Sequence, residues 1–301
     1  MQCNKCRREA LLFQEYSGQH LCRHHFEADL ERKAKHEIRS HRWLVPGDHI
    51  AVALSGDAGS SALLCFLKKL TASRRDIRIS AITVDAGIAG YSDMRIAKEI
   101  AGLSGTACIA VSFRERFGIT TDVIADRKGI TDACTYCRVI RDFLLKETAA
   151  EHGITKLASG EDLDERAAQV MEPVLRGTPE ILMHPGRGAP GKIPWIRPFA
   201  GIPGQEVALY ASLHVGKIDQ SRCPYDATPF EKDVHEMLNG LTARHPATKH
   251  ALVNLQKNLE RACTTNADTI PFCERCKEPG DGICMSCRII EEVTADAAQE
   301  R

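Results

Sequence analysis

Between residues 49 and 199 the chain alternates short apolar runs with longer stretches of helical periodicity. The apolar runs predict strands at 49–55, 77–85, 107–113, 154–160 and 193–199. The stretches between them predict helices at 60–72, 93–105, 135–152 and from about 163 onwards. Because such alternation builds parallel sheets with helices on both faces, we expect an α/β fold with a doubly wound parallel sheet. Ligands of such sheets bind at the carboxyl edge, which here gathers Ser55, Asp85, Cys134 and Gly160.

The stretch "LSGDAGSSALL", from position 54, is a glycine- and serine-rich turn between the first strand and its helix. Turns of this kind bind phosphate through backbone N–H groups and a helix N-terminus, and hydroxyl groups add donors. The candidate nucleotide contacts in the turn are Ser55, Gly56, Gly59, Ser60 and Ser61. The turn has no lysine, and Asp57 adds a negative charge beside the expected phosphates.

Most of the thirteen cysteines stand in C-x-x-C-type groups, and because the polar first residues predict no signal peptide, this spacing indicates metal or redox chemistry. The first group is Cys3, Cys6, Cys22 and His25, with His24 as an alternative to His25. The last group is Cys273, Cys276, Cys284 and Cys287. Each supplies the four ligands of a closed tetrahedral zinc site, and metal binding would stabilise segments too small to fold alone.

The central group differs, because Cys134, Cys137 and the distant Cys223 make only three thiolates. Three protein ligands leave one metal position open for chemistry. A cubane iron–sulfur cluster with one open iron fits this set, and so do a third zinc site and a disulfide-forming pair.

The ends of the chain change character relative to the middle. We expect a zinc finger at 1–27, a basic linker helix at 28–46, a catalytic domain at 47–228, a helical extension at 229–265 and a second finger with a tail at 266–301. The glycine- and proline-rich stretch 184–194 predicts a surface loop. The formal net charge is +0 and no stretch approaches the roughly 20 apolar residues of a membrane span, so we expect a soluble, cytoplasmic protein.

These motifs, in their order along nearly the whole chain, resemble the tRNA 2-thiouridine synthetases, the two-zinc-finger tRNA thiolation enzymes of the adenine nucleotide alpha-hydrolase superfamily. The resemblance rests on the two fingers, the glycine turn and the segments "VDAGIAGYS", "CTYCRVIR", "ASGEDLDE", "RPFAGIPGQEVALYA" and "RCPYD".

The resemblance implies an ATP- and Mg²⁺-dependent enzyme that adenylates a tRNA base and then replaces its oxygen by sulfur at a [4Fe–4S] cluster. It implies that Cys134, Cys137 and Cys223 hold the cluster and that Asp164 and Arg141 are catalytic. Asp85 ends the second strand, where the family shapes its adenine-binding side. The implied partners are tRNA, a second copy of the chain, and free sulfide or a ubiquitin-like carrier as the sulfur donor.

The chain departs from the family at two places. The family's S-G-G-x-D-S turn reads Ser-Gly-Asp-Ala-Gly-Ser here, and Glu161 and Asp162 replace the histidine and asparagine of "GHNLDD". The added acids predict a changed metal or nucleotide requirement, with Mg²⁺ between carboxylates and phosphates. The alternatives are a non-adenylating tRNA-binding or sulfur-relay protein of the same fold, and an ATP pyrophosphatase acting on another substrate.

Overall fold

The computed structural model describes the chain apart from residues 92–93, 179–181, 183–192, 217, 220, 222, 226–228, 264–272, 277–281 and 300–301. Within the described chain, no helix is both long and apolar enough to cross a membrane. Most of the stretch 184–194, and the domain boundary expected at 265, lie outside the described residues.

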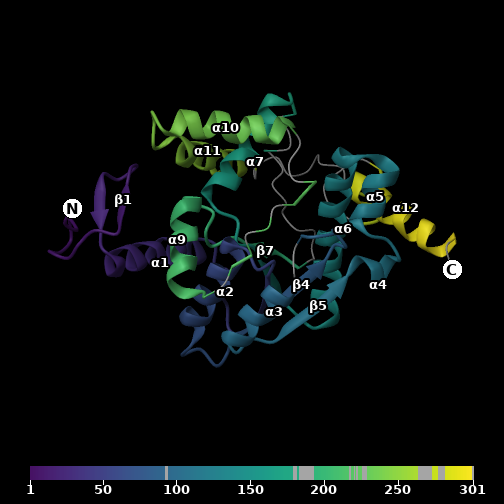
Figure 1. Ribbon diagram of the computed structural model, residues 1–301, viewed down its shortest axis with the longest axis horizontal. Helices are drawn as coiled ribbons and strands as arrows, with labels where there is room; N and C mark the ends of the chain where they lie inside the picture. Colours follow the sequence, from purple (N-terminus) through teal and green to yellow (C-terminus); the bar gives the residue numbers. More distant parts are fainter. Residues whose placement is uncertain are drawn as a thin grey trace.

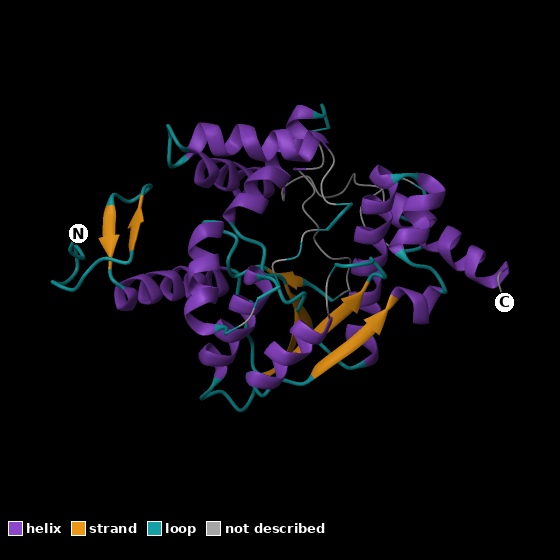
Figure 2. Cartoon of the chain, viewed as in Figure 1, coloured by secondary structure: helices purple, strands orange, loops and turns teal. Residues whose placement is uncertain are grey.

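A five-stranded parallel sheet forms the centre of the fold (Figure 1; strands are orange in Figure 2). Its strands are β3 (His49–Ala53), β4 (Arg78–Asp85), β5 (Cys108–Ser112), β6 (Lys156–Ala158) and β7 (Trp195–Ile196). They lie in the order β5-β4-β3-β6-β7 with parallel neighbours, which confirms the expected α/β fold. β7 is shorter than the expected run 193–199, because the flanking Pro194 and Pro198 cannot donate backbone hydrogen bonds.

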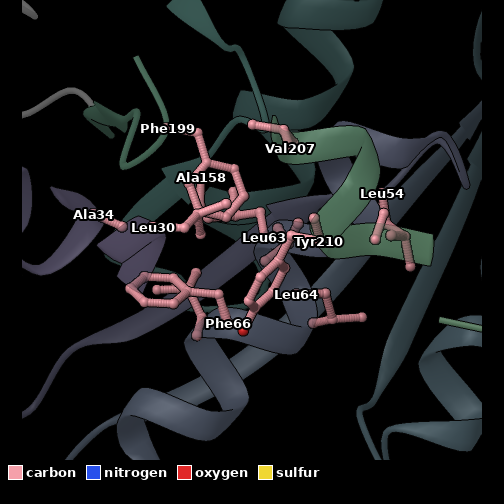
Figure 3. Packing of buried hydrophobic residues seen from close by; sticks show 14 of the residues in the cluster. Leu30, Ala34, Leu54, Leu63, Leu64, Phe66, Ala158, Phe199, Val207 and Tyr210 are labelled. Atoms are coloured by element: carbon pink, nitrogen blue, oxygen red, sulfur yellow. The ribbon is translucent and has the colours of Figure 1, made fainter. Parts of the chain in front are cut away.

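Helices cover both faces of the sheet, as expected. Ile50 and Val52 of β3 lie in a buried cluster that includes Leu63 and Tyr210, part of which Figure 3 shows. The helices of this face are α1 (Arg23–Ser40), α2 (Ala58–Thr71), α3 (Met94–Leu103) and α9 (Gly204–His214). Ala51 points to the other face, since successive strand residues alternate, and packs in a cluster with side chains of α6 (Ile130–Glu151).

Two further groups of helices extend this core. The first comprises α7 (Leu163–Leu175), α10 (Pro229–Thr242) and α11 (Thr248–Cys263), which pack together along one side of the molecule, at the top of Figure 1. The second comprises α4 (Phe113–Phe117), α5 (Thr121–Lys128) and α12 (Met285–Gln299), which lie around α6.

The N-terminal region begins with an antiparallel hairpin of β1 (Leu12–Gln14) and β2 (Gln19–Leu21). α1 follows directly after Cys22 and ends at Ser40, so the basic linker helix expected at 28–46 starts earlier, within the finger, and also ends earlier than expected. The hairpin and helices α4, α5 and α9 were not expected from the sequence. These elements depend on single local interactions. The helix α5, for example, begins where the Thr120 side chain accepts a 3.3 Å hydrogen bond from the backbone N–H of Val123.

Candidate functional site

A cavity of about 570 Å³ opens at the carboxyl ends of the central strands. Ser55 and Ser159, which follow β3 and β6, form one part of its wall. Its wall also includes the three central cysteines and the charged groups beside them: Cys134, Cys137, Cys223, Arg138, Arg141, Glu161 and Glu165. The cavity therefore joins the expected nucleotide edge of the sheet to the central cysteines.

The central cysteines lie at the wall of this cavity and form no disulfide with one another. Cys134 and Cys137 lie one turn apart on α6 and therefore share a helix face, while Cys223 comes from the segment before α10. All three residues are described, yet their ligand atoms do not all lie within 4.8 Å of one another, as those of the two terminal groups do. A zinc ion bound at about 2.3 Å by each sulfur would draw them closer, so the wider set suits a cluster of several irons better.

Arginines accompany both cysteines of α6. Nη2 of Arg141 donates to Sγ of Cys137 at 3.4 Å. Nη2 of Arg138 lies 3.8 Å from Sγ of Cys134 and donates to Oε1 of Glu231 at 2.9 Å. Positive charge favours the thiolate form that binds metal. Because a guanidinium stays protonated, Arg141 can supply charge and hydrogen bonds but cannot act as a base.

The two terminal groups have the geometry of single-ion sites. In the N-terminal group, Sγ of Cys6 and Cys22 are 3.7 Å apart and Nδ1 of His25 lies 3.4 Å from Sγ of Cys22. It is His25, and not His24, that joins this group. In the C-terminal group the sulfur pairs Cys273–Cys287 and Cys276–Cys284 are 3.8 and 3.6 Å apart. A tetrahedral zinc with Zn–S bonds of about 2.3 Å has S···S edges of about 3.8 Å, so both groups fit such an ion.

One thiol in each terminal group is poised to ionise. Burial would raise the pKa of Cys3, but backbone N–H groups of Cys22 and Lys5 outweigh it and lower the pKa to about 6. The backbone N–H of Cys284 donates to Sγ of Cys273 at 3.3 Å and is the largest cause of a pKa lowered to about 6. Both effects favour metal-binding thiolates at neutral pH.

In the glycine turn, Asp57 is the N-cap of α2. Its Oδ1 accepts a 2.7 Å hydrogen bond from the backbone N–H of Ser60, and its Oδ2 accepts a 2.8 Å bond from Oγ of Ser55. The hydroxyls of Ser55 and Ser60 are themselves 3.0 Å apart. Donors that would bind a phosphate at this helix end are thus already bonded to a carboxylate of the chain.

Two glycines of the expected site are required by packing. A Cβ on Gly160 would lie 2.3 Å from the carbonyl carbon of Gly59, and one on Gly59 would lie 2.8 Å from the carbonyl oxygen of Gly160. Only residues without side chains allow the start of α2 to lie against the loop after β6. Gly59 therefore has a structural role independent of any phosphate.

The two neighbouring acids Asp164 and Glu165 face different surroundings, since successive residues of a helix lie about 100° apart. Asp164 lines a second, smaller hollow of about 230 Å³, where its Oδ1 accepts a 3.0 Å bond from Nζ of the buried Lys249. Glu165 lines the main cavity. Although the Glu165 side chain is exposed to the solvent of this cavity, partial withdrawal of its carboxyl from bulk water, followed by repulsion from Asp162 and Glu161, raises its pKa to about 8. Sequence reasoning missed Glu165, although its adjacency to Asp164 was a usable signal.

Of the other residues expected to contact the nucleotide, only some lie in the wall of the cavity. Ser55 lines the cavity, whereas Gly56, Ser60, Ser61 and Asp85 are not in its wall. Asp85 instead accepts a 2.8 Å bond from the backbone N–H of Gly87 and so closes the turn after β4. Glu161 has a cationic partner, since Nε of Arg197 lies 2.9 Å from its Oε2.

Comparison with known proteins agrees with this architecture. Residues 2–27 match the family model described as "2-thiouridine synthetase TtuA, N-terminal LIM domain". The chain is 30% identical to the tRNA 2-thiolation protein NcsA of Haloferax volcanii, covering 98% of this chain and 100% of the relative. It is 31% identical to the cytoplasmic tRNA 2-thiolation protein 1 of Bos taurus, covering 96% and 87%. The solved structure of the U34-tRNA thiolase NcsA from Methanococcus maripaludis with its [4Fe-4S] cluster superposes with a TM-score of 0.83 at 26% identity, over 97% of this chain and 96% of that one.

The parallel sheet, the glycine turn after β3 and the cysteines at its carboxyl edge define an α/β protein of the adenine nucleotide alpha-hydrolase type. Within that class, the chain belongs to the family of tRNA 2-thiolation proteins.

Proposed function

We propose that this protein is a tRNA sulfurtransferase that replaces the 2-oxygen of a uridine by sulfur at the expense of ATP. The observation that carries the proposal is the single cavity that contains both the strand-end serines, Ser55 and Ser159, and the three cysteines. A nucleotide bound at the strand ends would present its α-phosphate to a base that also reaches the cysteines. The names of the relatives support the tRNA substrate, and that of the Bos taurus relative supports a cytoplasmic setting.

The proposed chemistry has two steps and no net redox change. First the uridine O2 attacks the α-phosphorus of ATP, pyrophosphate leaves and the ring N3 loses its proton. Then sulfur at the sulfide level adds to C2, the C2–O bond breaks, AMP leaves and N3 regains a proton. The sulfur donor in this scheme is free sulfide or a thiocarboxylated ubiquitin-like carrier.

Glu165 is the side chain best suited to hold the proton between these steps. It lines the cavity, and a pKa of about 8 lets its carboxyl both accept and return a proton near neutral pH. Arg141 would contribute fixed positive charge next to Cys137, where thiolates and the phosphate of the nucleotide would come together. Asp164, the acid implied by the resemblance, would instead hold the start of α7 through Lys249.

Cys134, Cys137 and Cys223 would hold a [4Fe–4S] cluster, which when bound supplies an open iron for sulfur. Their thiol chemistry, their spacing and the two neighbouring arginines fit that group. The two terminal groups would each hold a structural zinc. A homodimer that presents tRNA between copies completes the proposal.

A second candidate function is favoured by Asp57. Its carboxylate fills the hydrogen-bonding positions at the start of α2, and repulsion between it and a phosphate a few ångströms away is on the order of 1–4 kcal/mol. A protein that does not adenylate, and that relays sulfur or binds tRNA for another enzyme, would share the fold. Mg²⁺ between Asp57 and the phosphates would remove the conflict.

The test is thiolation in vitro. Protein reconstituted anaerobically with iron and sulfide is given unmodified tRNA, sulfide, Mg²⁺ and ATP, and the nucleosides are separated by mass spectrometry. We expect 2-thiouridine with ATP, and none without ATP or with the Cys137→Ala variant. Binding of ATP·Mg²⁺ is measured by calorimetry on the same protein. Cluster-loaded protein that binds no ATP and forms no 2-thiouridine would contradict adenylation and favour the relay.

A further inference from the structure

The turn of α6 that carries Cys134 and Cys137 is contacted, on the side away from the cavity, by the C-terminal cysteine module, which comprises the group Cys273, Cys276, Cys284 and Cys287 and the helix α12. Cys134, Cys137, Arg138 and Arg141 follow helical spacing and line the cavity. Tyr136 lies about 200° around the helix from Cys134 and therefore faces away from it. Oη of Tyr136 donates a 2.5 Å hydrogen bond to Oε2 of Glu292, on α12.

Glu292 is also bonded to a cation. Nζ of Lys128, at the end of α5, donates to its other carboxylate oxygen and lies 5.1 Å from the centre of the Tyr136 ring. Lys128 and Tyr136 together lower the pKa of Glu292, so the carboxylate is ionised and accepts from both. α5, α6 and α12 are thus joined at one point, beside the two cysteines.

Apolar packing reinforces this junction. Ile289 and Val293 of α12 are buried in the same cluster as Cys137 and Ile140 of α6, and Cys223 packs against that cluster. Ile289 is 5% and Val293 2% exposed. Two of the three central cysteines, Cys137 and Cys223, therefore lie in or against a cluster that α12 helps to form.

The same helix begins in the terminal cysteine group. α12 starts at Met285, so Cys284 immediately precedes it and Cys287 lies in its first turn. Glu292 follows Cys287 by five residues, about 7.5 Å along the helix axis. An ion held by Cys273, Cys276, Cys284 and Cys287 would fix the start of α12, and through it the position of Glu292.

We propose that Glu292 is a positioning residue for the central cysteine site, acting through Tyr136, and that the C-terminal cysteine module serves as a brace for the cluster-binding turn of α6. The proposal rests on the cluster assigned to Cys134, Cys137 and Cys223 under the proposed function. The brace acts within one chain and requires no contact between the module and tRNA.

The experiment compares Glu292→Gln and Tyr136→Phe with wild type. The matched control is Glu147→Gln, which removes a carboxylate that belongs to α6 itself and accepts a 2.9 Å hydrogen bond from Nε of Arg116 on α4. After anaerobic reconstitution, iron and zinc are counted and the loss of the cluster's visible absorption is followed in the presence of an iron chelator. We expect both test variants to lose the cluster about tenfold faster than wild type, with zinc content and melting temperature matching the control. Cluster lifetimes equal to that of wild type in both variants would overturn the proposal.

A second readout does not require the cluster. Hydrogen exchange of the amides in 130–140 is measured on zinc-loaded, iron-free protein. Faster exchange in Glu292→Gln than in Glu147→Gln is expected, and equal exchange contradicts the brace. If wild type itself took up no iron, the proposed function would fail at its cluster, and the exchange comparison would still decide the role of Glu292.

Discussion

The carboxylate of Asp57 and the backbone N–H of Ser60 are joined by a 2.7 Å hydrogen bond at the start of α2. In a turn built like a phosphate site, the anion at the helix end is a side chain of the protein itself. A nucleotide must therefore displace this carboxylate or reach it through a cation. That competition can be measured.

Replacing Asp57 by glycine should raise the affinity for ATP by about tenfold or more, because it removes a repulsion on the order of 1–4 kcal/mol and frees the N–H of Ser60. The loss of the cap should cost only a few tenths of a kcal/mol of stability. Calorimetry at several Mg²⁺ concentrations is the measurement. Asp57→Asn separates the effect of the charge from that of the freed N–H, since asparagine keeps a capping side chain but has no negative charge. Affinity for ATP no higher in Asp57→Gly than in wild type would show that the carboxylate does not compete.

Replacing Glu165 by glutamine should reduce the rate of thiolation by about 10²–10⁴-fold, the usual contribution of a positioned proton-transfer group. The wild-type rate should rise with pH through about 8, where the carboxyl loses its proton, because the ionised form accepts the proton of the base. The glutamine variant should show no such rise. A variant rate close to that of wild type, with the same pH profile, would remove Glu165 from the mechanism.

Asp164→Asn should act mainly on stability. The change leaves Nζ of Lys249, whose side chain is 8% exposed, without its carboxylate but still bonded to Oδ1 of Asn239, and because Asp164 is itself 34% exposed the loss should be about 1 kcal/mol. We expect a lower free energy of unfolding in urea and nearly unchanged ATP affinity. If instead thiolation stopped while stability was retained, Asp164 would take the catalytic role.

Asp29 links stability to pH. Burial would raise its pKa, but hydrogen bonds from Lys33 at 2.5 Å, Arg32 and Gln14 outweigh burial and lower it to about 2. A lowered carboxyl pKa stabilises the fold above the unfolded value of 3.8, and this contribution is lost as the pH falls towards 2. Asp29→Asn should therefore destabilise the protein by about 2 kcal/mol at neutral pH and by less near pH 2. Urea titrations at the two pH values test this, and an equal loss at both would exclude the ionic origin.

The terminal groups should bind zinc independently of each other. We expect two zinc ions per chain by elemental analysis, and one in Cys6→Ser or in Cys276→Ser, because each change breaks one four-ligand set. Cys65→Ser, outside both sets, is the control and should retain two. A single-site variant that loses both ions would show that the two modules fold together.

Several features could be predicted from the sequence because they depend on local spacing. Cys3 and Cys6, and likewise Cys284 and Cys287, are close in the chain, so their approach needs only a short turn. The strands at β3, β4 and β5 followed from apolar runs that any parallel sheet buries on both faces. The length of β7 and the existence of α5 were harder to predict from the sequence, because flanking prolines limit β7 and a single threonine cap starts α5.

The sequence by itself determined the α/β class, the three cysteine groups and the presence of an acid in the glycine turn. Only the tertiary structure decided what those residues touch. In the folded chain Asp57 accepts a hydrogen bond from Ser60, and Tyr136 donates one to Glu292. Asp164 contacts Lys249, whereas Glu165 lines the cavity. The physical reason is that ligand spacing and strand periodicity are short-range properties of a chain. The surroundings of a side chain, by contrast, depend on segments that are distant in sequence and meet only when the core packs.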